Sequence, residues 1–352
     1  MHTFLRTAGR VIVAIVVLLC AVFAFSAYRY SREMAIDTSR GVVESGYVRI
    51  GDIDQWIQIR GDDRANPVLL LLNGGPGFST ISDTRTFRSW EKQFTIVMWD
   101  QRGEGRTFQK SGPEGTGPMT IERMTGDGIE VAEYLRGHLH KDKIVVLGFS
   151  WGSILGVRMV KQRSDLFAAY VGSGQVTDEA ATMAASYPLV LARGRSLGNR
   201  EAEKELVAAG PPPYDPLEKS KAWLIWSNEL DPGRLKRPIT AGLPWAIIES
   251  RLAYRKGGEA AGADYSIRSL YREMLQVNLP ALGFKFEVPV VIIQGSGDLV
   301  VVTALAKDYF DNISAPHKDF VLLPGDGHLA IFRDSDAFLA ALAECVRPLL
   351  AR

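Results

Sequence analysis

Residues 143–153 read KIVVLGFSWGS, an apolar run that ends in the pattern Gly-x-Ser-x-Gly around Ser150. A short, wholly apolar run is typical of a strand covered on both faces, and the residues after the pattern have helical periodicity. A serine at such a strand–turn–helix junction projects its hydroxyl beyond the sheet, beside a helix N-terminus that favours negative charge. The stretch therefore predicts Ser150 as a nucleophile, with a plain tight turn as the alternative.

The same alternation of short apolar runs and helical segments continues along the chain. Buried strands separated by helices predict an α/β domain with a mostly parallel central sheet and helices on both faces. The expected strands are Val42–Ile50, Gln55–Arg60, Val68–Leu72, Thr95–Trp99, Lys143–Leu147, Ala168–Val171, Val288–Ile293 and Asp319–Leu323. The expected helices are Ile121–Leu139, Ser153–Arg163, Val302–Phe310 and Asp336–Leu350. The first two strands, separated by Gly51-Asp52, are expected to form a hairpin.

The strand pattern is interrupted between residues 175 and 287, which contain helix-like segments and no comparable apolar run. An insertion of more than 100 residues is too long for a loop. We therefore predict a helical cap at 175–287, inserted between two parts of the α/β core at 42–174 and 288–352.

The N-terminus contains an uncharged apolar stretch at residues 11–28, VIVAIVVLLCAVFAFSAY. A helix of this length covers roughly 27 Å, close to the hydrocarbon thickness of a bilayer. We predict a retained single-pass membrane anchor at 11–28, between a tail at 1–10 and a polar linker at 29–41. A cleaved secretory signal is the alternative. Arg6 and Arg10 before the span favour a cytoplasmic N-terminus, with the catalytic domain outside the cytoplasm.

The net charge, the cysteine count and the absence of certain motifs argue against several classes of partner and cofactor. The chain has 41 Lys and Arg against 40 Asp and Glu, a formal charge of +1, which gives no support to a nucleic-acid partner. Its two cysteines, Cys20 and Cys345, exclude a disulfide-stapled scaffold. We expect no cofactor, because no P-loop or dinucleotide fingerprint is present. We also expect no metal, because the His138-Leu139-His140 segment lacks a further ligand cluster.

A serine hydroxyl needs an adjacent base, and His328 is the predicted one. His328 follows the strand Asp319–Leu323, whereas His317 precedes that strand and falls at the opposite edge of the sheet. Asp298 is the first carboxylate after the strand Val288–Ile293, and it can hold the imidazole in the right tautomer. A structural loop histidine, and a turn or capping role for Asp298, are the alternatives.

Stabilising an oxyanion requires two backbone N–H donors. One is the amide of Trp151, directly after the nucleophile. The other is expected in the loop NGGPG, residues 73–77, where glycine lets the backbone approach a substrate carbonyl. Gly75 is our first choice and Gly74 the next, with an ordinary Gly-Pro turn as the alternative.

Three segments together resemble the proline iminopeptidase branch of the α/β-hydrolases, a family of serine peptidases. Residues 73–77 are similar to its H-G-G-P-G loop, residues 100–107 (DQRGEGRT) to its D-Q-R-G-x-G-x-S segment, and residues 148–153 (GFSWGS) to its nucleophile turn. The resemblance implies an α/β-hydrolase fold with a helical cap. It also implies an enzyme that releases N-terminal residues, often proline, from peptides. It also implies that Asn73 and Gly74 of the loop contact the substrate.

The chain departs from this family pattern at two places. Asn73 stands where the family has histidine. The family's cap motif W-x-x-W-E supplies a glutamate for the substrate's amino group, but here Trp223 and Trp226 are followed by Ser227, and Glu229 is the nearby carboxylate. We therefore predict a serine hydrolase that acts as an aminopeptidase, with Glu229 as a candidate for binding the amine. An esterase or amidase on small acyl substrates, and a non-catalytic binding protein of the same fold, are the alternatives.

Overall fold

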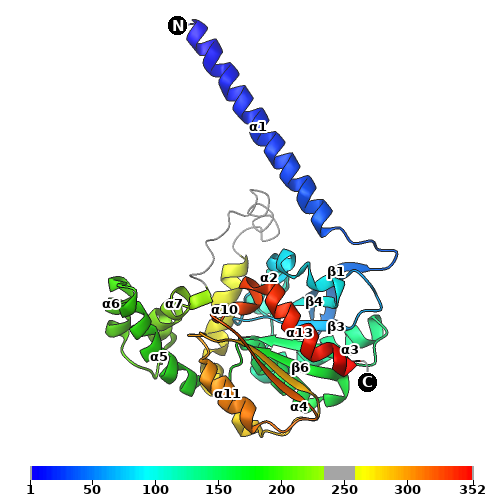
Figure 1. Cartoon of the computed structure of the whole chain (residues 1–352), viewed down its shortest axis with the longest axis vertical. Helices are drawn as coiled ribbons and strands as arrows, with labels where there is room; N and C mark the ends of the chain where they lie inside the picture. Colours follow the sequence, from blue (N-terminus) through cyan, green and yellow to red (C-terminus); the bar gives the residue numbers. More distant parts are fainter. Residues whose placement is uncertain (1, 234–257, 351–352) are drawn as a thin grey trace.

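The computed structural model describes residues 2–233 and 258–350, so part of the predicted cap, residues 234–257, lies outside the described residues (Figure 1). Within the described ranges, one sheet contains eight strands in the order β1-β2-β4-β3-β5-β6-β7-β8. These strands are β1 (Val42–Ile50), β2 (Ile53–Gly61), β3 (Val68–Leu72), β4 (Thr95–Asp100), β5 (Ile144–Phe149), β6 (Phe167–Ser173), β7 (Val290–Gly295) and β8 (Lys318–Leu323).

The sheet is antiparallel at one edge and parallel elsewhere. β1 and β2 form the predicted hairpin, β2 runs antiparallel to β4, and the remaining neighbours pair in parallel. The prediction of a mostly parallel sheet is confirmed. Because the carboxyl ends of parallel strands meet at one edge, the loops after β3, β5, β7 and β8 converge there.

Alternate residues of the central strands enter two different cores. Leu69 and Leu71 of β3 pack with Trp90 and Phe338 on one face, whereas Leu70 and Leu72 pack on the other face with Leu155. Helices on both faces are therefore confirmed. These helices are α2 (Gly105–Gly115), α3 (Ile121–His138), α4 (Trp151–Gln162), α11 (Thr303–Asn312), α12 (Ala330–Arg333) and α13 (Ser335–Leu350), with short 3-10 segments η1 (Ile81–Phe87), η2 (Trp90–Lys92), η3 (Ser164–Leu166) and η5 (Pro280–Leu282).

The α2 helix was not predicted from the sequence. Gly112 lies inside it at φ +62° and Pro113 follows, so the helix is kinked and its helical pattern is broken. Its first turn is stabilised by tertiary contacts instead, because Asp100 at the end of β4 accepts a hydrogen bond from the Arg106 amide at 2.8 Å.

The region between β6 and β7 is helical where it is described. It contains α5 (Glu179–Ser196), α6 (Arg200–Ala209), the 3-10 segment η4 (Leu217–Ser220), α7 (Lys221–Glu229) and α10 (Gly258–Met274). The helices α5, α6 and α7 lie together beside the sheet (Figure 1). They share a small apolar core that includes Met183, Val190, Leu206 and Trp223.

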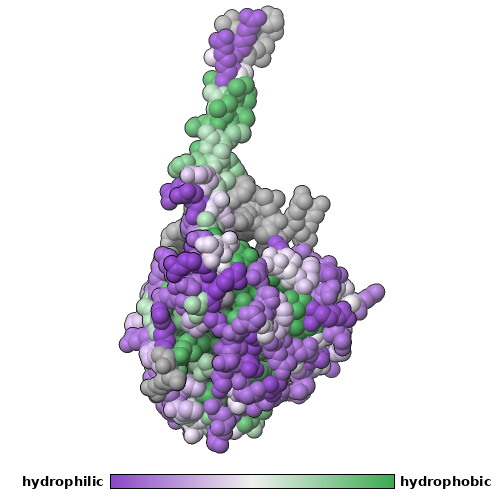
Figure 2. Space-filling model, turned by 90° about the vertical axis from the view of Figure 1, so that its right-hand side faces the viewer, coloured by the Kyte–Doolittle hydropathy of each residue, from purple (hydrophilic) through white to green (hydrophobic). Residues whose placement is uncertain are grey.

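A single long helix, α1 (His2–Met34), projects away from the domain (Figure 1). Its stretch Arg6–Met34 is long and apolar enough to cross a membrane, and only 6% of the residues in its apolar 18-residue window are buried. Hydrophobic residues cover its middle part (Figure 2). The helix runs beyond the predicted span of 11–28 at both ends, because Arg29 to Met34 continue it into the predicted linker.

Three arginines hold the C-terminal end of α1 against the domain. Arg85 binds the Glu33 carboxylate through two hydrogen bonds of 3.0 and 2.8 Å. Arg88 donates to the Glu33 carbonyl at 2.9 Å, and Arg60 donates to the Met34 carbonyl at 2.8 Å. Arg85 belongs to η1, so the segment that receives the helix is also close to the loop after β3.

Candidate active site

Ser150 occupies a strained position between β5 and α4. Its backbone has φ +52° and ψ −120°, a conformation that side-chain-bearing residues rarely adopt and that clusters at functional sites. The Ser150 amide donates to the Ser173 carbonyl of β6 at 2.8 Å, which helps to hold the turn. A Cβ on Gly148 would lie 2.5 Å from the Gly152 carbonyl oxygen, and one on Gly152 would overlap the Leu72 carbonyl. Both glycines of the Gly-x-Ser-x-Gly pattern are therefore required sterically.

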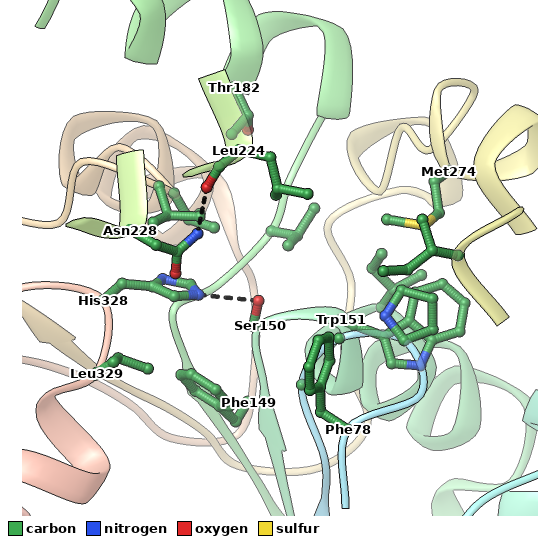
Figure 3. Close-up of a pocket in the computed structure, with 18 of the residues that line it drawn as sticks. Phe78, Phe149, Ser150, Trp151, Thr182, Leu224, Asn228, Met274, His328 and Leu329 are labelled. Atoms are coloured by element: carbon green, nitrogen blue, oxygen red, sulfur yellow. Dashed lines mark hydrogen bonds between the residues drawn. The ribbon is translucent and has the colours of Figure 1, made fainter. Parts of the chain in front are cut away.

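The structure brings Ser150, His328 and Asp298 into one hydrogen-bonded chain. His328 Nε2 lies 3.0 Å from Ser150 Oγ (Figure 3). On the other side of the ring, His328 Nδ1 lies 2.9 Å from Asp298 Oδ2. Because a carboxylate only accepts hydrogen bonds, Nδ1 carries the proton and Nε2 is left to accept from the serine hydroxyl. This is the tautomer that a general base needs.

Asp298 is held rigidly in the loop after β7. Its side chain is fully buried. Oδ1 accepts hydrogen bonds from the amides of Val300 and Val301 at 2.9 and 2.8 Å, and Oδ2 accepts from Gln294 Nε2 at 2.8 Å. The second oxygen is thereby aimed at His328, so the acid cannot rotate freely away from the base.

The charge around His328 favours its protonated form. Burial by itself lowers the pKa of the imidazole, but the carboxylates of Asp298, Asp231 and Glu179 outweigh it and raise the pKa above the ordinary value of 6.5. A proton taken from Ser150 would therefore be stabilised on His328 by negative charge on several sides.

The loop after β3 lies beside the nucleophile. A Cβ on Gly74 would lie 3.4 Å from Ser150 Cβ, and Gly75 adopts φ +123°, which favours glycine. Gly74, Gly75 and Trp151 all line the same cavity as Ser150. The two expected oxyanion donors therefore border one space.

Asn73 is placed differently from the expectation. It is fully buried and does not line the cavity. Its amide nitrogen donates to the Trp99 carbonyl at 2.9 Å and to Glu104, and its oxygen accepts from Thr80. The expected substrate contact of Asn73 is therefore corrected: its side chain braces the loop from beneath because its polar atoms are already satisfied.

The DQRGEGRT segment also supports the site from behind rather than lining it. Arg102 is 1% exposed and its Nε lies 2.9 Å from Asp127 Oδ2. Asp100 accepts from Ser79 of the loop that follows β3. The segment thus ties that loop to the end of β4.

A cavity of about 890 Å³ lies over Ser150 between the core and the cap. Most of its lining is apolar. The residues drawn in Figure 3 place Leu224 and Thr182 of the cap on the opposite side of Ser150 from Phe149, with Phe78, Trp151 and Met274 to one side. Its volume is at the upper end of the range for sites of small-molecule ligands.

Glu229 does not belong to this cavity. It ends α7 with an exposed side chain, whereas Trp223, Leu224 and Asn228 of the same helix line the space. Ser227, the residue directly after Trp226, is buried and donates to the Leu224 carbonyl of its own helix at 3.3 Å. The expectation that Glu229 contacts a substrate amine is therefore corrected, because it faces away from Ser150.

A different carboxylate of the cap reaches the cavity. Glu179, in the first turn of α5, lines the space that contains Ser150 and His328, and the residue is 8% exposed. Burial, followed by the nearby Asp178, raises the pKa of Glu179 to about 7. No described residue forms a hydrogen bond or ion pair with its carboxyl group. The rule that located Asp298 would not have found Glu179, because the first carboxylate after β6 is Asp178, which caps α5 by accepting a hydrogen bond from the Ala181 amide at 2.8 Å.

Comparison with known proteins matches the chain to one fold family and to relatives that are named as peptidases. The α/β-hydrolase fold family matches residues 67–335. A probable aminopeptidase YbaC of Bacillus subtilis is 29% identical over 313 residues, 85% of this chain and 94% of that protein. A probable proline iminopeptidase of Streptomyces coelicolor is 28% identical over 57% of this chain and 60% of that protein.

Solved structures show the same fold at low identity. The proline iminopeptidase of Mycobacterium smegmatis has a TM-score of 0.62 at 18% identity, over 87% of this chain and 98% of that one. A bacterial membrane phospholipase A has a TM-score of 0.62 at 15% identity, over 100% of both chains.

Proposed function

The chain belongs to the α/β-hydrolase family, and on that premise we propose that it is a serine hydrolase of the aminopeptidase type that works through an acyl-enzyme. The hydrogen-bonded chain Ser150–His328–Asp298 carries the proposal. The names of its relatives, a probable aminopeptidase and a probable proline iminopeptidase, support the choice of peptide substrates.

The proposed reaction has two steps. Ser150 Oγ attacks the acyl carbonyl while His328 Nε2 takes its proton, and the tetrahedral oxyanion accepts hydrogen bonds from the amides of Trp151 and Gly75. His328 then gives the proton to the leaving amine, which departs and leaves an ester on Ser150. Water, activated by the same imidazole, hydrolyses that ester.

Glu179 is the proposed partner of the substrate's free amino group. An ammonium placed in a largely apolar cavity needs a carboxylate, and Glu179 is a buried carboxylate that borders this space without a hydrogen-bond partner among the described residues. Because its pKa is about 7, binding of the amine should weaken as the pH falls below about 7, where Glu179 becomes neutral.

An ester hydrolase is the second candidate. The cavity is large and mostly apolar, which suits an acyl chain as well as a peptide. The membrane phospholipase A that shares the fold over the whole chain is consistent with this alternative.

We also propose that α1 is a retained membrane anchor that holds the catalytic domain outside the cytoplasm. Its apolar, almost fully exposed span and its fixed contact with Arg60, Arg85 and Arg88 support an anchor that stays attached, over a signal that is removed.

The first experiment tests the nucleophile. A fluorophosphonate probe should label the wild-type enzyme and fail to label Ser150→Ala. Equal labelling of both would refute the assignment of Ser150.

The second experiment tests the substrate class. Hydrolysis of proline naphthylamide is compared with that of short p-nitrophenyl esters. Glu179→Gln should raise KM for the amine-bearing substrate about 10- to 100-fold, the effect of losing a charge-assisted hydrogen bond, and leave KM for the esters unchanged. Glu229→Gln is the matched control and should behave as wild type. Ester turnover without any amide turnover in the wild type would reject the peptidase and leave the ester hydrolase.

A further inference from the structure

Asp231 is a buried carboxylate that connects the two loops carrying the proposed acid and base. It lies two residues after the end of α7 and is 1% exposed. Its Oδ2 accepts a hydrogen bond from the His328 backbone amide at 2.9 Å, and its Oδ1 accepts one from the Leu299 amide at 3.1 Å. Leu299 is the residue after Asp298, so each oxygen holds one of the two loops.

The close contact between Asp231 and the His328 loop depends on Gly327, the residue before the proposed base. A Cβ on Gly327 would overlap the Asp231 carboxylate, so another residue at 327 would force the carboxylate or the loop to move. The loop after β8 therefore packs directly against the Asp231 carboxylate at Gly327, the residue before His328.

Asp231 also contributes negative charge near His328. The charged groups around that imidazole are Asp298 from the loop after β7, Glu179 from α5 and Asp231 from the end of α7, while Arg333 of α12 lines the same cavity. Burial, followed by the charge of Asp298, raises the pKa of Asp231 to about 6, so Asp231 is mostly ionised at neutral pH.

We propose that Asp231 is a positioning residue that holds the loops of Asp298 and His328 in register and stabilises the imidazolium formed during the reaction. This inference rests on the proposed serine-hydrolase function. Because Asp231 extends from the end of α7, it makes the alignment of the base depend on the docked position of that cap helix.

The coupling to the cap has a structural basis. The helix that ends before Asp231 also presents Trp223, Leu224 and Asn228 to the cavity. A substrate that contacts these side chains therefore acts on the same rigid element that holds the backbone of His328. Binding energy from the cap side can in this way improve the geometry of proton transfer.

The test is Asp231→Asn in the full chain, which keeps the size of the side chain, removes its charge and turns an N–H₂ group toward one of the two amides. We expect kcat for a p-nitrophenyl ester to fall on the order of 10- to 100-fold with little change in KM. The acid limb of the profile of kcat/KM against pH should move to lower pH, because the imidazole loses an anionic neighbour. Rates are expressed per active site counted with the fluorophosphonate probe.

Asp127→Asn is the matched control. Asp127 is another fully buried carboxylate, paired with Arg102 at 2.9 Å and Arg123 at 2.8 Å, away from the catalytic loops. It should lower the melting temperature and leave the acid limb in place. A role of Asp231 in stability alone would give this same pattern for Asp231→Asn, and that result would overturn the proposal.

A second variant tests the proposal in case Asp231→Asn does not fold. If Asp231→Asn yields no folded protein, Gly327→Ala is measured instead, because its methyl group forces the Asp231 carboxylate or the loop of His328 to move and so breaks their contact. A loss of kcat supports the proposal, and wild-type kcat overturns it. Normal probe labelling of Ser150→Ala would instead indicate that the serine-hydrolase function itself is wrong, so the two failures are distinguishable.

Discussion

Gly174→Ala should disable the base without contacting the nucleophile. Gly174 follows β6 at φ +53°, and a Cβ there would lie 2.7 Å from His328 Cε1 and 3.0 Å from Nδ1. Carbon atoms pack at about 3.5–4.0 Å, so the imidazole must retreat by roughly 1 Å. The distance of 3.0 Å between Nε2 and Ser150 Oγ leaves little room for such a shift.

The size of the effect follows from that displacement. A misplacement of about 1 Å in a catalytic group costs on the order of 100-fold in rate, which corresponds to about 2.7 kcal/mol in the activation barrier. The positive φ adds a separate loss of about 1–2 kcal/mol in folding free energy. The variant should therefore be folded, somewhat less stable and nearly inactive.

Gly198→Ala is the control that separates the effect of backbone strain on stability from the effect of the displaced imidazole on activity. Gly198 lies after α5 at φ +64°, and nothing lies within 4 Å of the position that an added methyl group would take, so it shares the backbone strain and lacks the clash. The assay measures ester hydrolysis, the rate of fluorophosphonate labelling and urea unfolding for both variants. Similar stability losses with activity lost only in Gly174→Ala are expected. If Gly174→Ala keeps wild-type activity, the imidazole seen against Ser150 is not the working base.

Three further outcomes follow from the same structure. The kcat/KM of the wild type should fall as the pH drops, because His328 must be neutral to accept a proton. The midpoint of this fall should lie above pH 6.5, because neighbouring carboxylates raise the pKa of His328 above that value. A midpoint below pH 6.5 would contradict this prediction. Gly152→Ala should lower the free energy of unfolding by about 1–3 kcal/mol, because its methyl group overlaps the Leu72 carbonyl. Gly137→Ala, with open space around it in α3, should instead stabilise the protein by about 0.5–1 kcal/mol, and urea unfolding compares the two. Removing residues 2–28 should release the enzyme from the membrane fraction with unchanged kcat on a short soluble ester, and a truncated protein that still sediments with membranes would argue against an anchor.

The central strands β3 to β7 were predictable because they are short and buried on both faces, and β1 and β2 were predictable as a hairpin because Gly51-Asp52 separates them. Every expected strand is present, and the predicted ends differ from the observed ones by at most two residues. The proposed serine was predicted from the Gly-x-Ser-x-Gly pattern, and the proposed acid and base from the rule that ligand-binding residues follow the carboxyl ends of parallel strands. That rule needs only strand positions, which the sequence supplies.

The cap residues could not be assigned in the same way. Asp231 is 97 residues from His328 in the sequence, and it meets that residue only because α7 docks at a particular angle over the sheet. Helical periodicity does not encode that angle. Glu229 was chosen from its distance along the chain from Trp226, but its helical position turns it out of the cavity.

The contacts of Arg60, Arg85 and Arg88 with the end of α1 limit where the enzyme would work if this helix is the membrane anchor that we propose. With residues 11–28 inside a bilayer, the five residues from Arg29 to Glu33 rise by about 7.5 Å, which is close to the depth of the lipid headgroup layer. Arg60, Arg85 and Arg88 leave no slack in this short stalk, so the domain cannot swing out on a long tether. An enzyme anchored in this way would meet its substrates at the lipid surface, and its search for them would be two-dimensional.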